Sequence, residues 1–245
     1  MSFEPPQKGN PHQFVIRQHV HTAHAIAKFY GDDQRVDVME LESGSLRRCQ
    51  KRDAIFCARR VWDQRAEKGY MSHIEDEFHN QIDEVKSFEN RNHEAITNYL
   101  ILWNLRHYYH LNGKDNLKLN GVSGLNHTKD EQENMESKGM PYVNVDSEVP
   151  SRFNVSLSIM KYLDQRSAAF GYLKWGLFRA LEGEFLVADG YDGLKLLPIS
   201  PKLAFVAGCE DCDLGRRQVE WVNKISVDCA KEFYFARDFS ACPGA

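Results

Sequence analysis

The chain lacks the long apolar runs and the dense cysteines that mark several large classes of protein. No stretch of its 245 residues approaches the roughly 18 consecutive apolar residues that a membrane helix needs. Its opening, MSFEPPQKGNPHQ, shows no charged start followed by the apolar stretch of a secretion signal. Six scattered cysteines do not resemble a disulfide framework. We therefore expect a cytoplasmic protein with reduced thiols and no membrane partner.

Familiar catalytic signatures are also missing. The sequence has no glycine-rich phosphate loop, nucleophile elbow or dinucleotide fingerprint, which argues against P-loop NTPases, α/β-hydrolases and Rossmann oxidoreductases. Cys209 and Cys212 form a single C-x-x-C pair, whereas a closed zinc site needs further ligands. His107 and His110 share a helix face, but no carboxylate completes a metal-binding signature. We therefore assign no metal site, and the sequence does not identify a cofactor.

The composition is that of one ordinary globular domain. Hydrophobic residues make up 42% of the chain and charged residues 27%, so a core of normal size can form. The net charge of −4 opposes indiscriminate binding of nucleic acid. Any contact with nucleic acid must therefore come from a local basic patch.

The pattern of apolar residues predicts an α+β fold in a single domain over residues 14–239. Residues 1–13 carry prolines and polar side chains and are expected to form an extended arm. Residues 112–150 are polar and rich in glycine, so we expect a long and mobile excursion. Helices in the middle and strands at both ends indicate α+β architecture. The predicted elements are a helix over 19–30, a hairpin of 36–41 with 46–57, helices over 73–85, 92–111 and 153–165, an antiparallel meander of runs 172–181, 184–189, 194–199 and 203–207, and a closing helix over 216–237.

The order of these elements resembles the bacterial domain-of-unknown-function family 4238. The resemblance extends from about Phe14 to Phe239. It implies a context of anti-phage defence, because proteins similar to this one occur among bacterial defence candidates. The residues shared with the family's motifs are His19 and Phe29 of the opening, Arg106 at the end of the middle helix, Asp189, the run LPISP at 197–201, and Asn223.

Four polar residues at the ends of elements are candidates for catalysis: His19, Glu75, Arg106 and Asp189. An imidazole beside a carboxylate exchanges protons near neutral pH, and a guanidinium holds phosphate. We expect His19 to act as acid or base and Asp189 to orient it or to bind a metal, with Arg106 on phosphate. The alternative is a buried polar network in which Asp189 caps a turn and pairs with Arg106.

A basic patch lies within residues 46–60, where six cations accompany the single acid Asp53. On a hairpin these cations would share a solvated face, with Phe56 or Trp62 available for base stacking. The alternative is a strand face balanced by acids elsewhere, such as residues 75–77. The predicted nucleic-acid-binding residues are Arg47, Arg48, Lys51, Arg52, Arg59 and Arg60.

The basic patch and the resemblance together predict an anti-phage defence protein, a nuclease-type toxin acting on RNA or DNA. Nucleic acid is then the expected partner. The alternative is a non-catalytic sensor or interaction module that recognises a phage protein, its trigger, through residues 112–150. The oligomeric state does not follow from the sequence.

Overall fold

The computed structural model describes residues 4–193 and 195–245, and it confirms the α+β class. Met1–Phe3, in the predicted arm, and Leu194, at the start of a predicted meander run, lie outside the described residues. The helices are α1 (Ala23–Ala27), α2 (Gln64–Ala66), α3 (Ser72–Asp83), α4 (His93–Asn112), α5 (Lys129–Ser137), α6 (Ser151–Phe170) and α7 (Arg216–Cys229). The strands are β1 (Arg17–His19), β2 (Val36–Glu40), β3 (Ser45–Cys49), β4 (Cys57–Arg59), β5 (Leu117–Lys118), β6 (Glu148–Val149), β7 (Trp175–Ala180), β8 (Val187–Ala188), β9 (Leu196–Ser200), β10 (Leu203–Ala207), β11 (Cys212–Leu214) and β12 (Phe233–Ala236).

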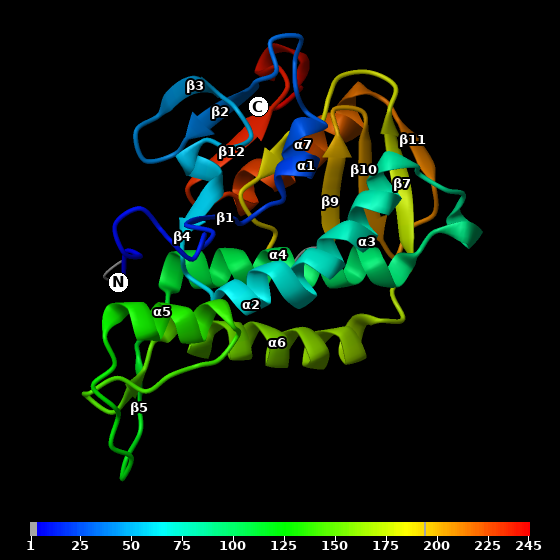
Figure 1. Ribbon diagram of the computed structural model, residues 1–245. Helices are drawn as coiled ribbons and strands as arrows, with labels where there is room; N and C mark the ends of the chain where they lie inside the picture. Colours follow the sequence, from blue (N-terminus) through cyan, green and yellow to red (C-terminus); the bar gives the residue numbers. More distant parts are fainter. Residues whose placement is uncertain (1–3, 194) are drawn as a thin grey trace.

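Two four-stranded sheets lie above a layer of helices (Figure 1). One sheet has the order β3-β2-β12-β8, and the other has the order β11-β7-β10-β9. The predicted meander over 172–207 is therefore wrong in two respects. Its second run contains β8, which leaves this group of strands and pairs with β12. β10 then lies between β7 and β9, and β11 adds a parallel edge to β7.

The predicted closing helix is correct only as far as Cys229. Residues 233–236 instead form β12, the strand between β2 and β8 in the first sheet. Its sequence, Phe-Tyr-Phe-Ala, is buried on both faces, as is typical of a central strand. The Asp189 carboxylate accepts backbone N–H groups of Lys231 and Glu232 at 2.9 and 2.6 Å. These long-range bonds hold an extended turn at a place where the local spacing of apolar residues predicts that the helix continues.

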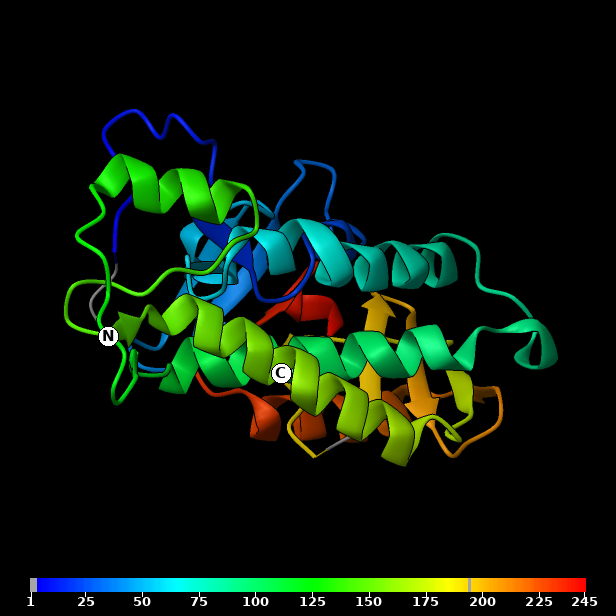
Figure 2. The same ribbon diagram turned by 60° about the horizontal axis from the view of Figure 1, so that its bottom comes forward.

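The structure confirms the middle helices that the sequence pattern predicts. α3 and α4 coincide closely with the helices expected over 73–85 and 92–111, and α6 extends the one expected over 153–165. Asn92 caps α4 by accepting the N–H of Ala95 at 3.1 Å. Gly113 ends the helix with φ +63°, a conformation that glycine adopts without strain. α4 packs against both α3 and α6, and Figure 2 shows it running beside α6.

The N-terminal part departs from the expected helix over 19–30. β1 comes first and pairs with β4, and α1 is only a short helix. The predicted hairpin is present as β2 and β3, but its second strand ends at Cys49. A turn and the 3₁₀ segment Ala54–Phe56 then lead into β4. The chain therefore changes direction within the segment that holds the basic patch.

The polar segment 112–150 contains regular structure of its own. β5 and β6 form a small antiparallel ribbon, which projects from the body beside α5 (Figure 1). Thr128 and Glu131 form a capping box that begins α5. Glu133 and Glu136 of α5 are buried. α5 is thus attached to the body through carboxylates, and these lead to the site described next.

Candidate functional site

Two of the four predicted catalytic residues, Glu75 and Arg106, lie in one polar network. Arg106 is 1% exposed, and its Nη1 donates to Glu75 Oε1 at 2.6 Å. Its Nη2 lies 3.8 Å from Glu67 Oε2. Burial alone would lower the pKa of Arg106, but the two carboxylates raise it. The Arg106 cation is therefore enclosed by the protein's own acids, and its visible effect is to hold Glu75 in place.

His19 lies beside this network at the end of β1. Its Nε2 is 2.9 Å from the carbonyl oxygen of Lys51, so that nitrogen carries the proton and donates. Burial lowers the pKa of His19, although the Lys51 carbonyl and the Glu75 carboxylate act in the opposite direction. His19 is consequently neutral at pH 7. Its role in catalysis stays a prediction.

Asp189 belongs to a different group of residues. It is buried, and its carboxylate accepts the backbone N–H groups of Lys231, Glu232 and Phe233. His107 Nε2 lies 3.4 Å from its Oδ2. Among the described residues, no hydrogen bond or ion pair joins it to the other three predicted catalytic residues. Asp189 caps a turn, as the alternative interpretation expected. It does not pair with Arg106, whose carboxylate partner is Glu75 instead.

The predicted basic patch separates into two parts. On β3, Arg47 Nε lies 2.5 Å from Glu40 Oε1, and Arg48 is similarly paired with Asp33 and Asp37. These local acids neutralise the positive charge of the strand face. Residues 75–77, which the alternative interpretation expected in this role, are not its ion-pair partners among the described residues. Phe56 and Trp62 are buried, so the stacking surface expected there is absent. Lys51 and Arg52 have no ion pair within the part of the chain that is described. The remaining pair, Arg59 and Arg60, lies at the end of β4 and faces a cavity.

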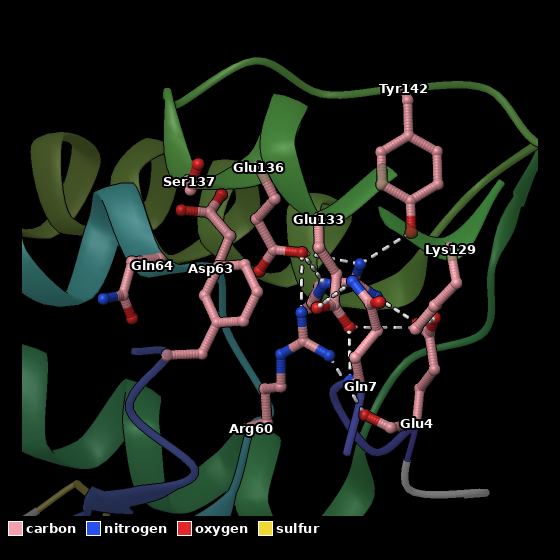
Figure 3. Close-up of polar contacts among 12 residues, drawn as sticks. Glu4, Gln7, Arg60, Asp63, Gln64, Lys129, Glu133, Glu136, Ser137 and Tyr142 are labelled. Atoms are coloured by element: carbon pink, nitrogen blue, oxygen red, sulfur yellow. Dashed lines mark hydrogen bonds and ion pairs between the residues drawn. The ribbon is translucent and has the colours of Figure 1, made fainter. Parts of the chain in front are cut away.

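Arg60 enters a buried cluster that the sequence analysis missed (Figure 3). We call Arg60, Glu136 and Arg152 the arginine cluster. Arg60 Nη2 and Arg152 Nη2 lie 2.8 and 2.7 Å from Glu136 Oε2. Arg152 Nη2 also donates to the Tyr142 hydroxyl at 2.8 Å. The cluster joins the end of β4, α5 and the start of α6, so it fixes the polar segment 112–150 to the body.

The N-terminal arm adds a carboxylate to this cluster. Glu4 forms ion pairs with Arg152 and with Lys129, and its carbonyl oxygen accepts Arg60 Nη1 at 3.1 Å. Burial alone would raise the pKa of the Glu4 carboxyl, but the two neighbouring cations lower it. The Glu4 side chain is nevertheless 43% exposed. We call the place where Arg152 and Lys129 hold this carboxylate the anion site.

A cavity of about 730 Å³ adjoins the anion site. Its volume lies within the roughly 300–1,000 Å³ range of small-molecule sites. We call it the large cavity, and segment 112–150 supplies much of its wall. The residues that line it are Glu4, Arg59, Arg60, Val61, His110, Asn116, Gln132, Tyr142, Asn144, Val145, Asp146, Pro150, Ser151 and Arg152.

The lining of the large cavity suits an anion that also carries polar edges. Three arginines face two acids in it, and guanidinium groups match phosphate oxygens in a bidentate manner. Amide side chains, which hydrogen-bond base edges in nucleic-acid complexes, are present at Asn116, Gln132 and Asn144. The cavity can therefore receive a unit of the size and polarity of a nucleotide.

Within residues 4–193 and 195–245, no group of three or more histidine, cysteine or acidic side chains has the geometry of a metal site. Cys209 and Cys212 are free thiols. None of the helices in the described chain is long and apolar enough to cross a bilayer.

The sequence contained one signal for α5, the helix that carries the part of the site that the sequence analysis missed. Thr128 and Glu131 have the spacing of a capping box, and Lys129, Glu133 and Glu136 follow at helical intervals. That pattern predicts α5, although it does not show that two of its glutamates are buried.

Comparison with known proteins finds no matching family model, no matching curated protein and no matching solved structure. The resemblance to family 4238 therefore stays a prediction.

Proposed function

We propose that the protein is a nuclease-type toxin that binds a strand of RNA or DNA in the large cavity. The observation that carries this proposal is the anion site, where Arg152 and Lys129 already hold the Glu4 carboxylate; Glu4 and Arg152 are also lining residues of the cavity. The context of phage defence comes from the resemblance alone and is part of the same proposal.

The anion site supports phosphate binding because its present occupant is exchangeable. Glu4 belongs to the N-terminal arm and is 43% exposed, so it can leave without opening the core. A phosphodiester brings charged oxygens that accept hydrogen bonds from the same cations. Arg59, exposed on the cavity wall, adds a further cation for the neighbouring phosphate. Binding of a strand there thus replaces the Glu4 carboxylate with a phosphate group.

We expect Arg59→Ala to weaken the binding of a single-stranded RNA oligomer about five- to tenfold and to reduce the salt slope by about 1. Fluorescence anisotropy over a series of salt concentrations measures both quantities. Arg47→Ala is the matched control, because Arg47 pairs with Glu40 and Asp53 on β3 and lies outside the cavity lining. The converse result, weak binding by Arg47→Ala and normal binding by Arg59→Ala, would move the contact to the face of β3.

A second function is favoured by the origin of the cavity wall. Segment 112–150 contributes Asn116, Gln132, Tyr142 and Asn144 to the lining, so a sensor that recognises a phage component through this segment would use the same cavity. The two functions differ in chemistry, because only the nuclease shortens a bound strand. Incubation of the wild type with an end-labelled oligomer, followed by gel analysis, separates them.

A further inference from the structure

The large cavity has one histidine among its lining residues, and that histidine is paired with a carboxylate. His110 lies in the last turn of α4, and its Nε2 is 3.3 Å from Oε2 of Glu232. Histidine is the side chain that most readily exchanges protons near neutral pH. The arginines of the same wall do not deprotonate. Glu4, Asp146 and Tyr142 of the same wall are also titratable, but His110 is the lining side chain whose ordinary pKa lies closest to neutral pH, which makes it the candidate for proton transfer to or from a bound strand.

Glu232 lies at ion-pair distance from Nε2 of this imidazole. A carboxylate beside Nε2 favours the proton on that nitrogen, which leaves Nδ1 as a proton acceptor. His110 is about a quarter exposed and Glu232 about half exposed. The pair is thus open to solvent, as a group that must meet a substrate has to be.

Asp189 holds the turn that carries Glu232 and lies beside the helix that carries His110. Its Oδ2 accepts the backbone N–H of Glu232 at 2.6 Å, which holds the turn that carries this glutamate. The same oxygen lies 3.4 Å from Nε2 of His107, one helical turn before His110 on the same face of α4. One buried carboxylate therefore holds the turn before β12 and lies beside α4 without a hydrogen bond to His107. Asp189 is a positioning residue that acts through Glu232.

We infer that His110, held by Glu232, is the catalytic acid and base of a ribonuclease that cleaves RNA by internal transesterification. This inference rests on the proposed function and narrows its substrate to RNA. His110 Nδ1 takes the proton of a ribose 2′-hydroxyl, and the 2′-oxygen forms a bond to the adjacent phosphorus. The bond from phosphorus to the 5′-oxygen breaks, and that oxygen receives the proton from the imidazolium. The products are a 2′,3′-cyclic phosphate and a 5′-hydroxyl, and the step needs no metal and no oxidant.

The test incubates the purified full-length chain with an RNA oligomer and with its all-2′-deoxy counterpart. We expect cleavage of RNA alone, with cyclic phosphate ends identified by mass spectrometry. His110→Gln should slow cleavage at least about a hundredfold, while the dissociation constant for the 2′-deoxy oligomer stays at the wild-type value. Glu232→Gln should give a smaller loss and a displaced pH profile. His73→Gln is the control, because His73 is an exposed residue of α3 outside the cavity lining.

The outcomes separate this inference from the proposed function. Cleavage by His110→Gln at the wild-type rate, or cutting of the 2′-deoxy oligomer, overturns the role of His110. RNA that binds to the wild type and stays intact overturns the inference and leaves binding in place. RNA that does not bind to the wild type overturns the proposed function as well. A thermal melt of each variant shows whether a loss of rate reflects unfolding.

Discussion

Replacing Glu136 with glutamine is expected to lower the free energy of unfolding by about 3 kcal/mol or more. The glutamine keeps the shape of the side chain but removes the charge that Arg60 and Arg152 share. Their side chains are only 2% and 5% exposed, so water replaces the lost partner poorly. Arg152 keeps Glu4 as a partner, but Arg60 loses its carboxylate, and an uncompensated buried charge is the costly case. Urea unfolding of the variant and the wild type measures the difference.

The matched control is Glu77→Gln on α3. Glu77 pairs with His73 at 3.6 Å, and both side chains are exposed, so its loss should change stability by less than about 0.5 kcal/mol. Hydrogen exchange adds a local readout, because α5 should lose protection in the Glu136 variant. Equal stability of the two variants would show that the arginine cluster does not hold segment 112–150.

We expect the wild-type protein to lose stability as the pH falls below 6.5, with His21 a major cause. Complete burial lowers the pKa of His21 from 6.5 to about 3, and its Nδ1 shares a hydrogen bond of 2.8 Å with the Tyr99 hydroxyl. Between these two pH values the unfolded chain binds a proton that the folded chain excludes. The free energy of unfolding therefore decreases on acidification, by about 1.4 kcal/mol for each pH unit below 6.5.

His21→Gln isolates this contribution. Glutamine does not titrate, so the part of the pH dependence that belongs to His21 disappears, while His19, His79 and His93, whose pKa values burial also lowers, remain in both proteins. Between pH 7 and pH 5 the variant should lose about 2 kcal/mol less than the wild type. Parallel stability curves for the two proteins would contradict a buried neutral His21.

Local signals in the sequence were sufficient to predict the central helices. The capping side chain of Asn92, the apolar spacing of α3 and the glycine after α4 each act within a few residues, and each was visible in the sequence. β12 and β8 depend on partners far along the chain. Asp189 reaches the turn before β12 across more than 40 residues, so nothing near Phe233 distinguishes the end of a helix from its continuation.

The site was predictable only in part for the same reason. Arg60 and Glu136 are 76 residues apart in sequence, and neither a buried arginine nor its partner has a local pattern. Clustering of cations suggested one basic face, but the turn between β3 and β4 divides it. Asp189 was expected to orient His19, but its carboxylate instead accepts backbone N–H groups of the turn at Glu232, and a role for it in catalysis stays a prediction.

The most direct test of nucleic-acid binding at the anion site is the affinity of Glu4→Gln for single-stranded RNA. Removing the carboxylate takes one anion away from Arg152 and Lys129, which keep Glu136 and Glu133 as partners. The dissociation constant should therefore fall roughly fivefold, the equivalent of about 1 kcal/mol for one partly exposed ion pair. Glu131→Gln is the control, because it removes one negative charge from α5 and glutamine still serves a capping box. A gain confined to Glu4→Gln supports the account. An equal gain in both variants, or none in either, would contradict a phosphate site beneath the Glu4 carboxylate.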